Sequence, residues 1–245
     1  MPEDKSGAGK EMTEALMREG RSFRPLPELV AKANINPLQY DEAVKKGSRD
    51  LEGFWEEAAY ELDWFQKWDQ VLDRSGAPFY KWFVNGKTNI AYNAVDRHVQ
   101  TGRKNQVAII FESEEGVRAR MTYYSLYRYT NMLANGLTAL GVTKGDRVTL
   151  YLPNIPHAAV AMLACAKIGA IHCFVYAGFS AMALRDRVND AEAKVIITVD
   201  GFQRNGKVIQ LKDIVDQAMV ACPTVENIVV VKWADIPVDM TDGRY

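Results

Sequence analysis

The stretch of sequence that decides the fold runs from Val175 to Lys207 and reads VYAGFSAMALRDRVNDAEAKVIITVDGFQRNGK. It opens on a short apolar run, turns at Gly178, continues as a helix-like segment and returns to a second apolar run that ends at Val199. Two short apolar runs joined by a segment of helical length are typical of a βαβ unit, whose strands are parallel. The stretch therefore predicts an α/β fold.

The same alternation continues on both sides of this stretch. Predicted elements follow one another at 148–153 (strand), 156–168 (helix), 172–177 (strand), 180–191 (helix), 194–199 (strand), 210–220 (helix) and 227–232 (strand). The strands are nearly continuous apolar runs, as in a parallel sheet that is covered on both faces. We therefore predict a partly parallel sheet with right-handed βαβ crossovers.

The residues just before this region predict a hairpin and a helix. Two β-prone runs, 106–113 and 118–123, flank Glu114-Glu115-Gly116. A helix is expected next, with Thr122 as its N-cap and Gly141 as a left-handed residue after its last turn.

The N-terminal part of the chain predicts a further helix and an extension. Residues 50–72 are expected to be helical, with these residues on one face: Phe54, Trp55, Ala58, Ala59 and Leu62. The first 39 residues include Pro25, Pro27 and Pro37 and show little periodicity, which favours a loosely packed segment. The sheet is therefore expected to follow a mostly helical extension.

The composition excludes several classes of protein. The chain has 245 residues, of which 48% are hydrophobic and 25% charged, so it can bury a sizeable core and resembles neither a membrane protein nor a disordered one. Its 30 basic and 31 acidic side chains give a formal net charge of −1, which attracts neither nucleic acid nor an anionic membrane. Residues 1–10 are polar where a signal peptide needs an apolar core, which predicts a cytoplasmic protein.

The cysteines and histidines argue against a disulfide framework and a metal site. Three cysteines without CxxC spacing are interpreted as small buried hydrophobic residues: Cys165, Cys173 and Cys222. His157 and His172 lie in apolar runs without metal-ligand spacing and are expected at core or boundary positions. Asp96-Arg97-His98 has no paired nucleophile and is expected to be structural. We predict no metal site.

The turn after Val199 is the main candidate for a ligand site. In parallel sheets ligands bind at the carboxyl ends of the strands, where the turns after Tyr176 and Val199 lie. Arg204 and Lys207 flank Gly206 there, which brings charge and backbone N–H groups together and suits a phosphate. The spacing alone leaves open that both cations are only solvated.

A nucleotide-binding P-loop is a second interpretation of this turn. Residues 201–207 match the first seven positions of GxxxxGK[ST], but Val208 replaces the hydroxyl residue that holds Mg²⁺. Val208-Ile209 is also a poor start for the helix that follows a P-loop. A P-loop NTPase is thus the less favoured alternative. A similar ending at 85–88, Asn-Gly-Lys-Thr, lacks the first glycine and is interpreted as a surface turn.

Several phrases of the sequence, taken together, carry a family resemblance. They are LDWF (62–65), WDQVLD (68–73), WFVNGKTN (82–89), LGVTKGDRV (140–148), AMLACAKIGAIH (161–172) and GFS (178–180). In combination they resemble the AMP-forming acyl-coenzyme A synthetases of the adenylate-forming superfamily, and within it the acetyl-coenzyme A synthetases. The resemblance implies that the predicted sheet is part of the large N-terminal domain of such an enzyme.

The resemblance also implies a reaction and a site. Such enzymes join acetate to ATP, release diphosphate and then transfer the acetyl group from the adenylate to coenzyme A (CoA). In the family, the segment that matches Arg204, Asn205, Gly206 and Lys207 contacts the phosphates of CoA. The glycine that matches Gly178 lets the chain pass close to the pantetheine arm of CoA.

The family pattern is incomplete in this chain. Lys207 stands where the family usually has arginine, and Tyr176-Ala177 stands where it usually has Phe-Gly. The chain lacks the Thr/Ser/Gly-rich loop ending in Pro-Lys-Gly that grips ATP, and the C-terminal domain with its catalytic lysine. We therefore expect the N-terminal part of an acetate–CoA ligase, inactive alone and without a catalytic residue. ATP and Mg²⁺ are expected to bind mainly outside the chain, and the missing C-terminal part is expected to be its partner.

The resemblance predicts three segments and leaves two alternatives. The segments are an extended N-terminal segment (1–39), the acetyl-CoA synthetase N-terminal segment (40–100) and the truncated first part of the AMP-binding domain (101–245). One alternative is a non-catalytic module that binds CoA or a nucleotide. The other is a ligase for propionate or another short-chain acid, because the acyl pocket lies outside this sequence.

Overall fold

The computed structural model describes residues 20 and 22–240. The chain divides into two compact units, Met1–Glu61 and Leu62–Tyr245, and each is described by itself. In the described part of the chain, no helix is both long enough and apolar enough to cross a membrane.

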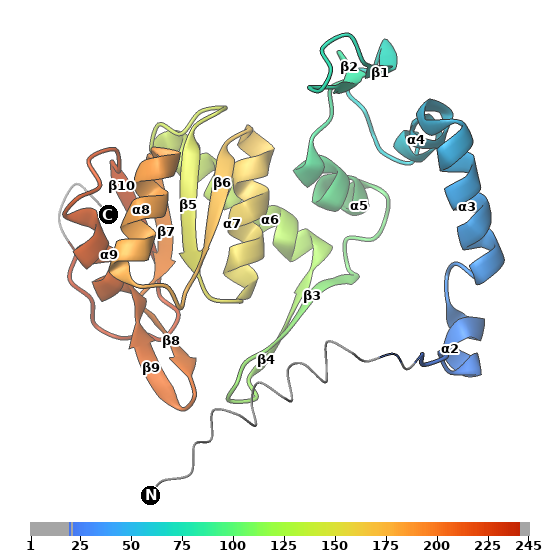
Figure 1. Cartoon of the computed structure of the whole chain (residues 1–245). Helices are drawn as coiled ribbons and strands as arrows, with labels where there is room; N and C mark the ends of the chain where they lie inside the picture. The colour runs from blue at the N-terminus through green and yellow to red at the C-terminus, as the bar shows by residue number, and fades with distance from the viewer. Residues whose placement is uncertain (1–19, 21, 241–245) are drawn as a thin grey trace, which may run out of the picture. The chain divides into compact units, whose positions relative to one another are not determined.

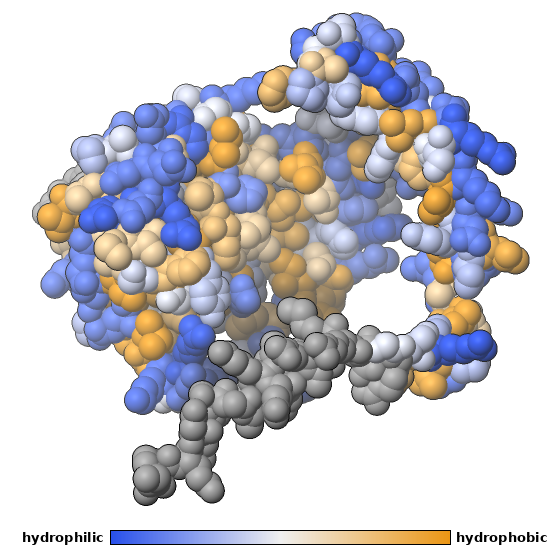
Figure 2. Space-filling model, viewed as in Figure 1, coloured by the Kyte–Doolittle hydropathy of each residue, from blue (hydrophilic) through white to orange (hydrophobic). Residues whose placement is uncertain are grey.

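The described part of the first unit is helical, as predicted. Its helices are α2 (Pro27–Lys32), α3 (Pro37–Arg49) and α4 (Leu51–Ala59). Asn36 and Gln39 start α3 with a capping box, because each side chain accepts the other residue's backbone N–H at 2.9 Å. Asp50 caps α4 by accepting the N–H of Gly53 at 2.9 Å. Most of the surface of α3 is hydrophilic (Figure 2).

The helix predicted for residues 50–72 is shorter than expected. It ends at Ala59, and Trp55, one of the residues expected on a shared helical face, is exposed. In the second unit, the N–H of Asp63 donates to Oδ1 of Asn93 at 2.8 Å, and Nδ2 of Asn93 donates to the carbonyl of Asp63 at 3.0 Å. Because these backbone groups are paired with a side chain, the segment has no need of helical hydrogen bonds.

A small aromatic cluster lies next to the first hairpin of the second unit, β1 (Gln70–Asp73) and β2 (Lys81–Val84). The ring centroids of Trp64 and Trp68 are 4.8 Å apart, and those of Trp68 and Phe83 are 5.1 Å apart. Edge-to-face rings at these distances stabilise the segment by packing.

The centre of the second unit is a parallel sheet (Figure 1). Its strands are β5 (Arg147–Leu152), β6 (Ile171–Tyr176), β7 (Val195–Val199) and β10 (Asn227–Val231), in the order β10-β7-β5-β6. All neighbouring strands are parallel. The four predicted strands are confirmed, each with a shift of at most one residue at either end.

Helices cover both faces of this sheet. They are α6 (Tyr123–Ala139), α7 (Pro156–Ile168), α8 (Ala181–Ala191) and α9 (Leu211–Met219). Helix α7 packs against α6, β5 and β6, whereas α8 packs against α9. Since right-handed crossovers in opposite directions along a sheet place their helices on opposite faces, α7 and α8 lie on different sides. The three helices predicted between the strands are confirmed.

Strand β6 is more exposed than the prediction of a fully covered sheet requires. Ile171 is 55% and Tyr176 50% exposed, whereas β5 and β7 are buried along nearly their whole length. His172, expected at a core or boundary position, is exposed for the same reason. Among the described residues β6 pairs only with β5, so one edge of β6 presents unpaired backbone groups.

Two hairpins extend from this core. The first, β3 (Val107–Glu112) with β4 (Arg118–Thr122), confirms the predicted hairpin. Helix α6 follows it with the predicted caps, since the side chain of Thr122 accepts the N–H of Ser125 and Gly141 has φ +81°. The second hairpin, β8 (Gly201–Arg204) with β9 (Lys207–Gln210), was not predicted.

The second hairpin excludes the P-loop interpretation. A P-loop opens directly into a helix after its Gly-Lys pair, whereas here Lys207 begins strand β9, and α9 starts only at Leu211. The β-branched pair Val208-Ile209 lies in that strand, as β-propensity favours.

Candidate functional site

A pocket of about 600 Å³ opens at the carboxyl edge of the parallel sheet. Its walls are the segments that follow β5, β6 and β10, together with strand β8 and the β3–β4 hairpin. The residues that line it include Glu114, Tyr176, Phe202, Arg204, Trp233 and Ala234. Open parallel sheets bind ligands at this edge, so the pocket lies where the sequence predicted a site.

The β8–β9 hairpin places the two predicted cations side by side. Asn205 and Gly206 form a two-residue turn with φ of +50° and +70°, which is the type I′ geometry that Asn-Gly favours. Arg204 and Lys207 are directly opposite each other across the ladder, so both side chains point to the same face. That face also carries Phe202, which lines the pocket.

The turn after β6 brings Gly178 against Arg204. A Cβ atom placed on Gly178 would lie 2.4 Å from Cε1 of Tyr176 and 3.0 Å from Nη1 of Arg204. The guanidinium carbon of Arg204 lies 5.7 Å from the centroid of the Tyr176 ring, within the range of a cation–π contact. A side chain at position 178 would therefore displace the Tyr176 ring or the Arg204 guanidinium.

Tyr151 of β5 is hydrogen-bonded to the backbone of this turn. Its hydroxyl donates to the carbonyl of Phe179 at 2.6 Å and lies 3.4 Å from the carbonyl of Ala177. Burial raises the pKa of Tyr151 from 10.0 to about 12, so the hydroxyl keeps its proton and remains a donor at physiological pH. The sequence analysis missed this residue, because a tyrosine in a buried strand gave no sign of its partner.

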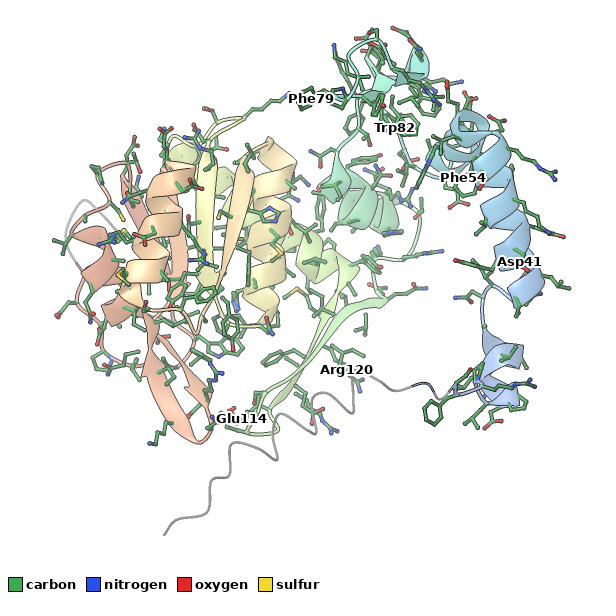
Figure 3. All side chains as sticks on the ribbon, in the orientation of Figure 1. Asp41, Phe54, Phe79, Trp82, Glu114 and Arg120 are labelled. Carbon is green, nitrogen blue, oxygen red and sulfur yellow. The ribbon has the colours of Figure 1, made fainter. Side chains whose placement is uncertain are left out.

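A carboxylate already occupies one backbone donor of the candidate site. The N–H of Asn205 donates to both carboxylate oxygens of Glu114, at 3.0 and 2.9 Å. Glu114 lies at the tip of the β3–β4 hairpin, next to the β8–β9 hairpin (Figure 3). One backbone donor of the segment that the family resemblance assigns to the phosphates of CoA is therefore occupied, whereas no ion pair engages Arg204 or Lys207 within the described residues.

Asp200, directly after β7, anchors the base of the β8–β9 hairpin. Its side chain is fully buried and accepts four backbone N–H groups, those of Gly201, Trp233, Ala234 and Ile236. Burial alone would raise the pKa of Asp200, but the backbone donors outweigh it and hold the pKa below its ordinary value of 3.8. The sequence analysis missed this residue too, although an acidic residue ending an apolar strand was a usable signal.

The remaining candidates have structural positions. Asp96, at the end of the π-helical turn η1 (Tyr92–Asp96), forms an ion pair with Lys167 of α7 at 2.6 Å, as expected for a structural group. Cys165 and Cys222 are buried as predicted, but Cys173 is half-buried. Within residues 20 and 22–240, His, Cys, Asp and Glu form no cluster of three or more that could hold a metal ion.

Comparison with protein families identifies the class. A family model described as "AMP-binding enzyme" matches residues 95–241, and one described as "Acetyl-coenzyme A synthetase N-terminus" matches residues 40–94. Because the first match alone spans more than half of the chain, the chain belongs to the family of AMP-binding enzymes.

Individual relatives narrow the similarity. The chain is 45% identical over 232 residues to an acetyl-coenzyme A synthetase of Deinococcus radiodurans, and the alignment covers 94% of this chain and 36% of that protein. It is 51% identical over 206 residues to an acetyl-coenzyme A synthetase of Pyrobaculum arsenaticum, which covers 80% of this chain and 30% of that protein. These matches confirm the resemblance inferred from the sequence phrases.

A solved structure supports the same relationship. The acetoacetyl-CoA synthetase from Streptomyces lividans superposes with a TM-score of 0.79 at 29% identity, over 90% of this chain and 36% of that chain. The chain therefore spans about a third of the length of the relatives that it matches.

Proposed function

We propose that this chain acts as the N-terminal part of an AMP-forming acetate–CoA ligase and supplies part of its CoA site. The complete reaction converts acetate, ATP and CoA to acetyl-CoA, AMP and diphosphate. The matched relatives named acetyl-coenzyme A synthetase support this proposal, and so does the pocket at the carboxyl edge of the sheet.

The convergence of Arg204, Lys207 and Gly178 is the observation that carries the proposed CoA site. Two cations on one face of a rigid hairpin suit the diphosphate of CoA, because charge-assisted hydrogen bonds to phosphate are strong. Because Gly178 has no Cβ, the Tyr176 ring and the Arg204 guanidinium pack close to the backbone at the point where the family resemblance places the pantetheine arm. Gly206, with no atom within 4 Å of a Cβ placed on it, offers a further open backbone segment in the same turn.

Other parts of the activity are assigned to polypeptide beyond this chain. ATP and Mg²⁺ are proposed to bind mainly there, and no catalytic residue is assigned to the residues described. The acyl substrate is proposed to be acetate, with propionate or another short-chain acid as the alternative. The division into segments 1–39, 40–100 and 101–245 and the cytoplasmic location remain proposals.

Arg204→Ala tests the proposed CoA site. Loss of one charge-assisted phosphate contact of about 1.5 to 3 kcal/mol should weaken CoA binding by about 10- to 150-fold. Calorimetric titration of the chain with CoA measures this. Lys87→Ala is the matched control, because Lys87 is an exposed lysine in the similar Gly-Lys-Thr turn outside the pocket, and it should bind CoA like the unaltered chain. Equal binding by Arg204→Ala and the control would refute the site.

A second experiment tests the division of labour. The isolated chain should not catalyse acetate-dependent exchange between ATP and diphosphate, since adenylation is assigned elsewhere. Robust exchange would contradict that assignment. A non-catalytic binding module is favoured instead if a chain extended by the downstream part of a matched relative binds CoA but forms no acetyl-CoA.

A further inference from the structure

Asp200, which directly follows β7, accepts hydrogen bonds from two segments that line the pocket, strand β8 and the segment after β10. Oδ1 of Asp200 accepts the N–H of Gly201 at 2.7 Å, and Gly201 is the first residue of the strand that ends at Arg204. The same oxygen accepts the N–H groups of Trp233 and Ala234 at 2.8 and 2.9 Å. Trp233 and Ala234 line the same pocket as Arg204.

The other carboxylate oxygen of Asp200 accepts a further hydrogen bond from the segment after β10. Oδ2 of Asp200 accepts the N–H of Ile236 at 3.1 Å. The backbone of Asp200 is tied as well, since its N–H donates to Val231 at 3.1 Å and its carbonyl accepts from Lys212 at 3.3 Å. The residue therefore joins β7, β10, the start of α9 and the base of the β8–β9 hairpin at one buried point.

Core stability alone does not explain a carboxylate in this position. Transfer of a charged group to the interior is costly unless hydrogen bonds satisfy it, and here four backbone donors do so. One of these donors is the first residue of β8, and the other three belong to the segment after β10. A neutral amide could keep the three donors of Oδ1, but it could not also accept the N–H of Ile236.

Resting on the proposed CoA site, we infer that Asp200 is a positioning residue that sets the distance between the hairpin bearing Arg204 and the loop bearing Trp233. Asp200 is not among the residues that line the pocket. It fixes the start of β8 relative to the segment after β10. Arg204, at the end of β8, is therefore already positioned for the phosphates of CoA before CoA binds. Preorganisation of this kind lowers the entropic cost of binding.

Asp200→Asn is the sharpest variant because it keeps the shape of the side chain. The amide oxygen can keep the three donors of Oδ1, but the amide nitrogen replaces Oδ2 and meets the N–H of Ile236, which is also a donor. We expect CoA binding about tenfold weaker, which is the loss of roughly one hydrogen bond to a charged group. Thr198→Val is the control for lost stability, since Thr198 is buried in the same strand and donates only to Tyr151 of the neighbouring strand, at 3.0 Å.

A double-mutant cycle separates positioning from general damage. If Asp200 acts through Arg204, then Asp200→Asn should weaken CoA binding in the native chain and have almost no effect in the Arg204→Ala background. Equal effects in both backgrounds would overturn the inference. CoA binding by Asp200→Asn that matches the unaltered chain would also overturn it, while leaving the Arg204 site intact. No effect of Arg204→Ala on its own would instead refute the proposed function.

Amide hydrogen exchange of the unaltered chain tests the positioning role if Asp200→Asn does not fold. In the unaltered chain the amides of Gly201, Trp233, Ala234 and Ile236 should exchange as one unit, and CoA should slow all four together. Independent exchange rates, or rates that CoA leaves unchanged while calorimetry shows that it binds, would contradict the positioning role.

Discussion

The base and the tip of the β8–β9 hairpin differ in almost every physical respect. At the base, Asp200 and Gly201 are buried and their backbone and side-chain groups are paired within the fold. At the tip, residues 204–207 are exposed, and the surface there is hydrophilic (Figure 2). The fold therefore determines where the tip lies, while the side chains of Arg204 and Lys207 at the tip form no ion pair within the described residues.

Substitution of the two hairpin glycines should give the largest difference in stability between the base and the tip. A Cβ atom on Gly201 would lie 2.9 Å from the backbone carbonyl oxygen of Ile209, so Gly201→Ala should lower the free energy of unfolding by about 1 to 3 kcal/mol. Gly206→Ala meets no atom within 4 Å but must adopt φ +70°, which costs about 1 kcal/mol. Urea unfolding of both variants measures the difference. A larger loss at Gly206 would show that the tip, not the base, limits stability.

The buried hydroxyl under the neighbouring turn gives a smaller effect. Tyr151→Phe removes the donor to Phe179 and should lower the free energy of unfolding by about 1 kcal/mol at pH 8.5. CoA binding should weaken only slightly, because the tip residues are unchanged. Urea unfolding and calorimetric titration at the same pH test this, and unchanged stability would show that the hydrogen bond contributes nothing net.

The same tyrosine predicts a pH dependence at the alkaline end. Burial raises the pKa of Tyr151 from 10.0 and that of Cys165 from 9.0, both to about 12. Each folded group keeps its proton after the unfolded chain has lost it, so their contribution is complete below pH 9 and falls as the pH rises towards 12. Tyr151→Phe should lose less stability between pH 10 and 12 than the unaltered chain. Parallel curves for both proteins over that interval would exclude the Tyr151 contribution.

The contact between the two hairpin tips should give the smallest effect. Glu114→Gln removes a negative charge next to Arg204 and Lys207, so CoA should bind about threefold more tightly, as expected for an exposed charge pair. Asp213→Asn is the control, because Asp213 is an exposed acidic residue outside the pocket, and it should bind CoA like the unaltered chain. Calorimetric titration at low salt measures both. Weaker binding by Glu114→Gln would mean that the carboxylate orders the tip rather than competing with phosphate.

Periodicity predicted the parallel sheet, because continuous apolar runs such as 195–199 are buried on both faces in the structure. It could not predict the β8–β9 hairpin, although Asn205-Gly206 is a strong hairpin signal, because its strands are only four residues long and contain as many polar residues as non-polar ones. The exposure of β6 was also missed, since its apolar sequence looks like that of a central strand.

For the candidate site, the sequence indicated the tip but not its supports. Arg204 and Lys207 stand out as cations near glycine, whereas the roles of Tyr151, Asp200 and Glu114 depend on partners 26 to 91 residues away in the chain. Contacts at such separations follow from the topology of the sheet and leave no local pattern. Whether Asn205 contacts a phosphate remains a prediction, since its N–H faces Glu114.

The open edge of β6 has a practical consequence for handling this chain. Proteins usually protect such an edge with lysine or proline, but β6 reads Ile-His-Cys-Phe-Val-Tyr and contains neither. A second molecule can therefore add its own strand there, in a ladder that extends from chain to chain. Light scattering that increases with protein concentration would reveal such association, and Ile171→Lys or Phe174→Lys should suppress it.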